Sequence, residues 1–227
     1  MNSKRYIAIG VSLIVFLFIN TSITFARSVY VISDTQKSHL QAYKIDGTNL
    51  IYQVSYMCQL DPPDDSGAVA IAIDDSEYGQ FLFATFEFSD EIELVNAKTM
   101  QYADVVTALG ATDLAGIAMD ISNSKLYVVD RYTNHLYSYS WNAAAKTLTP
   151  DFNNPYYIQL EDISGETNKG AFGIALDEEN GLLYVADNTN EIKYYDTNDW
   201  HKGPITRAEI VIFKVFPACR KYLVVFP

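Results

Sequence analysis

A short phrase of apolar residues and one aspartate recurs along this chain and constrains its fold more than any other feature. Two copies are nearly complete, and each runs Gly-Ile-Ala-x-Asp, a polar turn, then Leu-Tyr-Val-x-Asp. They occupy residues Gly116–Asp130 and Gly173–Asp187. A looser copy spans Ala70–Thr85, and residues Val29–Tyr43 match only the later part of the unit. A repeat of this size made of short strands is typical of a β-propeller, so the sequence predicts an all-β fold.

Each unit divides into four expected strands. The first is small and apolar, which suits a crowded inner strand. The second, such as Leu126–Val129, is apolar on both faces, as a buried strand requires. The third alternates, as in Leu136–Ser140, and the fourth is more variable. Fourth strands are expected at Ala103–Thr107, Tyr156–Leu160 and Ala208–Phe213, and loop insertions at 142–154 and 161–170.

The spacing of the units supports four-stranded antiparallel blades. Equivalent positions are Tyr30, Leu82, Tyr127 and Tyr184, which are 52, 45 and 57 residues apart. About four blades are visible in residues 27–213, and the first lacks its inner strand. Two alternatives stay open. The propeller is incomplete, either as a truncated chain or as one that pairs with a second copy in a homodimer, or Tyr222–Phe226 in the tail 214–227 completes the first blade of a small closed ring.

The first 26 residues have the features of a secretory signal peptide. Two basic residues precede an apolar run, Ile7–Ile19, and Thr24 and Ala26 place small residues at the two positions read for cleavage. The run is shorter than the roughly 20 residues that a membrane-spanning helix needs. We therefore expect residues 1–26 to be a cleaved signal peptide. The remaining chain is then secreted or periplasmic, with no membrane span.

The chain is strongly acidic, with a formal net charge of −12 at pH 7. Removal of residues 1–26 would take away two positive charges and no negative ones, and no cluster of Lys and Arg offsets the excess. Because phosphate backbones repel such a surface, the sequence argues against nucleic acid as a partner. Solubility alone accounts for the charge, and attraction of cations is the alternative.

The cysteine pattern leaves a disulfide open. Cys58 and Cys219 are the only cysteines, and they match neither a CxxC motif nor the spacing of zinc ligands. In an oxidising compartment they could pair and join the first and last blades. Their positions in the sequence do not show that they meet.

The unit that contains Asp130 resembles the NHL repeat. Its Asn134-His135-Leu136 is the triplet for which that repeat is named, and the unit that begins at Gly173 is similar, with Asn-Glu-Ile at the triplet. The YVTN and gluconolactonase-related propellers share much of this pattern. The resemblance covers nearly all of residues 28–213 and implies a propeller that binds or scaffolds, with enzymes in the minority. Such propellers usually have about six blades, more than this chain shows.

The resemblance implies two functions. We expect a binding or scaffold module for a protein or glycan partner. The alternative is a metal-dependent hydrolase of the lactonase type, in which carboxylate and amide side chains from several blades hold a divalent metal. Asp120, Asp177, Asn188 and Glu166 could form such a set, but nothing in their spacing selects them. The sequence has no serine elbow, paired-histidine zinc motif or phosphate-binding glycine loop.

Asp74, Asp120 and Asp177 end the first strand of three units and are the candidate metal ligands. If they face the channel, their carboxylates could hold calcium or another divalent cation, since hard cations take several oxygen ligands. The structural alternative is that each aspartate accepts hydrogen bonds from its own turn. A residue that recurs in every unit serves the repeat first, so we favour the structural alternative and expect no cofactor.

Trp141, Phe152 and Trp200 are the candidate residues for a partner surface. Large aromatic residues are enriched where proteins contact their partners. Trp141 and Trp200 both follow the third strand of their units. The alternative is therefore that these two side chains pack between blades.

Overall fold

The computed structural model describes residues 13–17, 28–33, 38–46, 49–60, 68–76, 79–152, 157–160, 170–187 and 192–198. In these residues every regular element is a β-strand, which confirms the all-β prediction. No helix long and apolar enough to cross a bilayer occurs in the part of the chain that is described.

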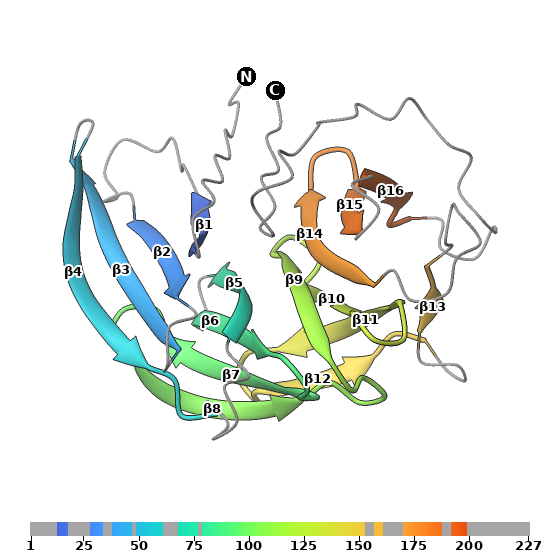
Figure 1. Ribbon diagram of the computed structural model, residues 1–227, viewed down its shortest axis with the longest axis horizontal. Coiled ribbons are helices and arrows are strands. Elements are labelled where there is room, and N and C mark those ends of the chain that lie inside the picture. The colour runs from blue at the N-terminus through green and yellow to red at the C-terminus, as the bar shows by residue number, and fades with distance from the viewer. Residues whose placement is uncertain are drawn as a thin grey trace.

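The strands form four antiparallel sheets in chain order (Figure 1). Blade one is β1 (Leu13–Leu17), β2 (Ser28–Ser33), β3 (His39–Asp46) and β4 (Asn49–Met57). Blade two is β5 (Ala68–Ser76), β6 (Gly79–Phe86), β7 (Glu91–Asn96) and β8 (Gln101–Thr107). Blade three is β9 (Leu114–Asp120), β10 (Lys125–Asp130), β11 (His135–Asn142), β12 (Thr147–Pro150) and β13 (Ile158–Gln159). Blade four is β14 (Ala171–Asp177), β15 (Leu182–Asp187) and β16 (Ile192–Asp196).

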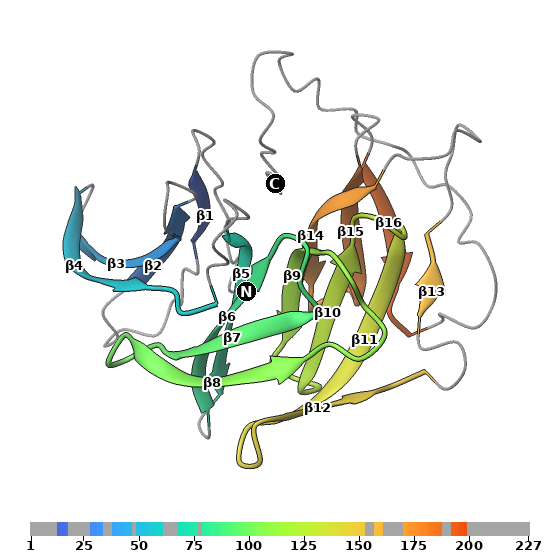
Figure 2. The same cartoon turned by 60° about the horizontal axis from the view of Figure 1, so that its bottom comes forward.

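The four sheets follow one another around an arc, as the two views in Figures 1 and 2 show. The first strand of each blade lies innermost, and β9 packs against both β5 and β14. The order of strands within each blade therefore follows the chain from the inside outward, as the sequence predicts. No closed ring is seen among the described strands.

Blade one differs from the expectation at its inner position. β1 pairs antiparallel with β2 over five residues, from Leu13 opposite Ser33 to Leu17 opposite Val29. β1 lies inside the apolar run assigned to the signal peptide, because five consecutive apolar residues meet the needs of a buried strand as well as those of a signal. The expected gap in blade one is thus wrong for this structure. Tyr222–Phe226 lies outside the described residues, and the signal peptide stays a prediction.

The outer edge of blade three also differs from the expectation. Its fourth strand was expected at Tyr156–Leu160, but two short segments share this edge. β12 pairs with the end of β11, and β13 pairs with its start through Gln159 opposite His135 and Ile158 opposite Leu136. The expected insertion therefore contains the β11–β12 hairpin. In blade four the expected fourth strand, Ala208–Phe213, lies outside the described residues.

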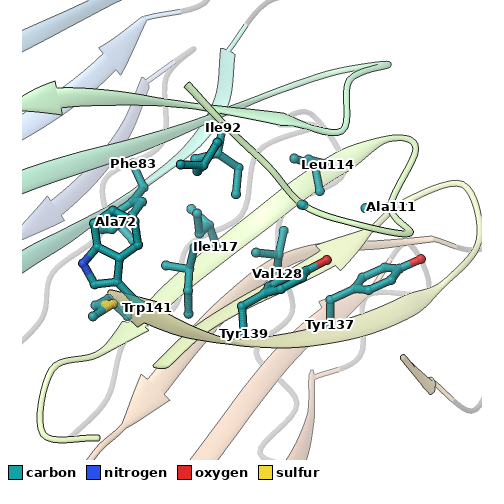
Figure 3. Close-up of a cluster of buried hydrophobic side chains, with 14 of the residues drawn as sticks. Ala72, Phe83, Ile92, Ala111, Leu114, Ile117, Val128, Tyr137, Tyr139 and Trp141 are labelled. Atoms are coloured by element: carbon teal, nitrogen blue, oxygen red, sulfur yellow. The ribbon is translucent and has the colours of Figure 1, made fainter. Parts of the chain in front are cut away.

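The described residues form three clusters of buried side chains, one between each pair of successive blades. The largest joins blades two and three and contains Phe83, Ile117, Val128 and Trp141 (Figure 3). Every residue of β9 is buried, because this inner strand has a blade on either side. At about 1.5–3 kcal/mol for each large apolar side chain buried, these interfaces rather than single blades stabilise the fold.

Candidate functional site

Three loops from blades two and three meet at one end of the strands. In an antiparallel blade, the turn between the second and third strands lies at the same end as the link to the next blade. Residues 87–90, 108–113 and 131–134 therefore come together, and we call this surface the Phe88 face. Backbone hydrogen bonds join its loops: Leu114 N donates to Ser89 O (3.1 Å), Ala108 N to Asp90 O (2.7 Å) and Arg131 N to Asp113 O (2.9 Å).

Arg131 is the centre of this face. Its guanidinium donates from Nε to Asp113 Oδ2 (3.0 Å) and from Nη1 to Glu87 Oε1 (2.5 Å). The same group lies 5.4 Å from the ring centroid of Phe88 and 5.7 Å from that of Phe172. Burial alone would lower the pKa of Arg131, but hydrogen bonds to Asp113 and Glu87 outweigh it and raise the pKa. Arg131 thus ties together loops of blades two and three and contacts Phe172 on β14 of blade four.

Asp130 fixes the turn that follows β10. Its side chain is fully buried and accepts hydrogen bonds from the backbone N–H groups of Thr112 (2.7 Å), Asp113 (3.1 Å) and Thr133 (2.8 Å). The hydroxyl of Thr112 donates to it as well. Burial raises the pKa of Asp130, but these four donors outweigh burial and hold the pKa below its ordinary value. Asp130 therefore remains ionised and holds two loops of the Phe88 face in place.

Two stacked tyrosines support the loop between β8 and β9. The rings of Tyr137 and Tyr139 are nearly parallel, 6.2 Å apart, and their hydroxyls point the same way in Figure 3. Tyr137 Oη donates to Gly110 O (2.6 Å), and Tyr139 Oη donates to Leu109 O (3.1 Å). Burial raises the pKa of Tyr137 to about 12, so the hydroxyl remains a donor at neutral pH.

Three large apolar side chains project from this scaffold into solvent. Phe88 is 71% exposed, Tyr132 is 84% exposed and Leu109 is 51% exposed. Phe88 also has a backbone φ of 57°, in the left-handed region that bulky residues rarely adopt, and its N–H donates to Asp113 Oδ1 (2.9 Å). Such strain costs about 1–3 kcal/mol and collects at binding and catalytic sites. The turn therefore holds the backbone of the exposed Phe88 in a conformation that is uncommon for a bulky residue.

The predicted metal ligands do not form a metal site in the described part of the chain. Asp120 accepts from the N–H and the side-chain amide of Asn123, and Asp177 does the same with Asn180. Both aspartates therefore fold their own turns, as the structural alternative states. Asp74 is buried and accepts from Trp141 Nε1 (2.8 Å). No group of three His, Cys, Asp or Glu side chains suited to a metal occurs among the described residues.

The predicted partner surface requires a correction. Trp141 is 6% exposed and lies edge-on to the rings of Phe81 and Phe83, so it packs between blades two and three. Phe152 is also buried. The neighbouring blade covers Trp141, and burial leaves little of Phe152 for a partner to contact. Trp200 lies outside the described residues.

Other predicted residues cannot be compared with the structure. Asn188 and Glu166 of the lactonase set lie outside the described residues, and so does Cys219. Cys58 is buried between blades one and two. The disulfide stays a prediction.

Sequence reasoning missed the residues of the Phe88 face. Phe88 and Tyr132 each occupy a short turn between two strands, in Glu-Phe-Ser-Asp and Arg-Tyr-Thr-Asn. An aromatic residue at such a turn has no blade to pack against, and that signal could have drawn attention to both. Nothing in the sequence indicates that Arg131 connects them.

Comparisons with known proteins identify the fold. No family model matches the chain, and no curated protein matches it in sequence. It is similar to the crystal structure of the RRP9 WD40 repeats (TM-score 0.51, 12% identity, 74% of this chain and 44% of that one). It is also similar to U3-55K, with a TM-score of 0.50 and 13% identity over 74% of this chain and 45% of that one. A chain of a nidogen/laminin complex is similar as well, with a TM-score of 0.55 and 14% identity over 88% of this chain and 76% of that one. This likeness shows a β-propeller and does not select the NHL repeat.

The chain is shorter than the structures that it matches. It spans less than half the length of the first two of them.

Replacing Asp130 with asparagine is expected to lower the free energy of unfolding at pH 7 by about 2–3 kcal/mol, because a buried hydrogen-bonded carboxylate is lost. The folded-state pKa of Asp130 lies below its unfolded-state value. Its contribution is therefore complete above the unfolded-state pKa, about 3.9, and is lost as the pH falls through the folded-state pKa. Urea unfolding of wild type and Asp130→Asn should show a difference that shrinks on acidification.

The exposed Asp104 is the matched control, because its carboxylate also has a lowered pKa and pairs with Lys146 at the surface. Asp104→Asn should change stability little at any pH, since solvent screens an exposed ion pair. A loss for Asp130→Asn that does not vary with pH would contradict the role of the charge.

Proposed function

We propose that this protein is a binding module that contacts a protein partner through the Phe88 face. The observation that carries the proposal is the exposure of Phe88, Tyr132 and Leu109 on loops that hydrogen bonds hold rigid. Aromatic residues in such positions dominate binding energy when a partner covers them, and a rigid display avoids the cost of ordering them. The fold supports a binding role, since one similar chain comes from an assembly of nidogen with laminin.

The Phe88 face takes the place of the partner surface predicted from the sequence, in which Trp141 and Phe152 are buried. We keep the extracytoplasmic location that the signal-like N-terminus predicts. A glycan is the other partner class that the sequence analysis left open, and aromatic rings can also contact sugars. We place protein first because the surface combines two aromatic rings with the aliphatic Leu109, which gives apolar area rather than a polar sugar site. The lactonase alternative gains no support from Asp120 and Asp177, which bond within their own turns.

The test compares wild type and two variants as immobilised bait in extract of the cells that produce the protein. Wild type should retain a protein partner, and Phe88→Ser combined with Tyr132→Ser should reduce its retention about thirtyfold or more. Tyr52→Ser is the control, because Tyr52 is also 53% exposed but lies on β4 of blade one. This variant should retain the partner fully. Thermal unfolding must show that both variants fold as wild type does.

Two results would overturn the proposal. In one, the double variant retains the partner as wild type does. In the other, Tyr52→Ser loses the partner as well. Digestion of glycans on the retained protein separates the two partner classes, since recognition of a sugar would end with its removal.

A further inference from the structure

The Phe88 face carries more negative than positive charge. Its loops and the first residue of β7 contain four carboxylates, on Glu87, Asp90, Glu91 and Asp113, against the single guanidinium of Arg131. Two of the four, Glu87 and Asp113, already pair with Arg131. The positive charge of Arg131 is thus neutralised within the protein and is not available to an anionic partner.

The other two carboxylates have no such pairing. Asp90 is exposed and Glu91 is half-buried, and neither makes an ion pair among the described residues. The backbone carbonyl of Asp90 accepts the N–H of Ala108, the residue before Leu109. Burial raises the pKa of Tyr139, and nearby Tyr137, Asp130 and, least of the three, Asp90 raise it further. The unpaired charge of Asp90 therefore lies on a loop that is bonded to the loop displaying Leu109, and Glu91 is the next residue along the chain.

Aromatic rings next to unpaired carboxylates favour one kind of ligand. The face of an aromatic ring attracts cations, by about 0.5–2 kcal/mol for each contact. A guanidinium does so best, because its plane stacks on a ring while its N–H groups reach carboxylates. Arg131 already makes this pair of contacts from within, with Phe88 on one side and Asp113 on the other. The exposed surface of Phe88 and Tyr132 offers the same combination to an arginine from outside.

We infer that the Phe88 face binds a cationic segment of its partner, one that places an arginine or lysine beside an apolar side chain. This inference rests on the proposed function and adds the chemistry of the partner to it. The cation lies over the rings of Phe88 and Tyr132 and pairs with Asp90 and Glu91, and the apolar side chain covers Leu109. The net charge of −12 on the whole chain steers such a segment toward it and makes association sensitive to salt.

The test uses two synthetic peptides that alternate a charged residue with leucine and tryptophan. One carries arginine at the charged positions and the other carries glutamate. Fluorescence anisotropy should show that wild type binds the arginine peptide and not the glutamate peptide. Asp90→Asn with Glu91→Gln should weaken binding about five- to tenfold, as expected for two charge pairs at the surface, one exposed and one half-buried. Glu179→Gln is the control, since Glu179 is exposed in the β14–β15 turn at the opposite end of the strands.

The outcomes separate this inference from the proposed function. If Phe88→Ser with Tyr132→Ser abolishes retention of the partner but Asp90→Asn with Glu91→Gln changes neither retention nor peptide binding, the cationic partner is wrong and the binding face stands. If the arginine peptide binds equally to the Phe88 and Tyr132 double variant, or if Glu179→Gln weakens binding as much, the attraction is a property of the whole acidic chain. The inference then fails.

Discussion

Replacing Gly116 with alanine is expected to lower the free energy of unfolding by about 2–3 kcal/mol, as over-packing in a rigid interior does. A Cβ at this position would lie 2.8 Å from the backbone nitrogen of Ile174 and 3.0 Å from Cα and C of Gly173. These atoms belong to β14, so the clash is with backbone and no side chain can turn away to relieve it. The inner strands of blades three and four would have to separate. Urea unfolding of Gly116→Ala against wild type measures the loss.

Gly173 provides the matched control for this prediction. It occupies the same position in the next unit, but among the described residues a Cβ there would meet only the Cβ of Ala186, at 4.0 Å. Gly173→Ala should therefore change the free energy of unfolding by less than about 0.5 kcal/mol. Equal losses for the two variants would contradict the explanation. They would mean that another inner strand lies against β14 in solution, as it does against β9.

These two glycines show how far the sequence predicts the fold. A Gly-Ile-Ala phrase that recurs beside an aspartate indicates a crowded inner strand, and the structure gives the reason at Gly116, where two backbones nearly touch. The aspartate of the phrase was also assigned correctly at Asp120 and Asp177, because an Asx turn depends only on residues three positions away. Features that depend on neighbouring residues, such as these turns, recur in each unit, and so they can be recognised from a single sequence.

Contacts between blades follow no such local rule. Trp141 is buried because blade two packs against it, and its indole N–H donates to Asp74, a residue 67 positions earlier in that blade. The sequence presented it as one of two alternatives and could not choose between them. The Phe88 face is similar, since Arg131 meets Glu87 only after two blades have packed. The repeated residues therefore predict the strands of each blade, but the residues of the candidate site differ from blade to blade and cannot be predicted from the repeat.

Blade one shows a different limit. Five apolar residues in β1 satisfy the pattern of a signal peptide and the pattern of an inner strand, and the sequence analysis assigned them to the first. Hydrophobicity alone does not distinguish the two. The environment of the segment decides which pattern it serves.

Replacing Glu93 with alanine is expected to lower the free energy of unfolding by about 3 kcal/mol, because it leaves buried donors without an acceptor. Glu93 lies on β7 of blade two and is fully buried. Its carboxylate accepts from Tyr56 Oη (2.5 Å) and from the backbone N–H groups of Gln59 (2.8 Å) and Leu60 (2.8 Å). These donors all follow or end β4, so one side chain attaches the outer edge of blade one to blade two. Urea unfolding at pH 7 measures the loss.

A graded series tests whether Glu93 acts through these three bonds. Burial and then the hydrogen bond to Glu93 raise the pKa of Tyr56, so its hydroxyl remains a donor at neutral pH. Tyr56→Phe removes one donor and keeps the other two satisfied, so it should cost about 1 kcal/mol, a third of the effect of Glu93→Ala. Hydrogen exchange at Gln59 and Leu60 should accelerate in Glu93→Ala and not in Tyr56→Phe. If those amides stay protected in Glu93→Ala, the carboxylate does not hold the segment, and the link between blades one and two rests on their apolar contacts alone.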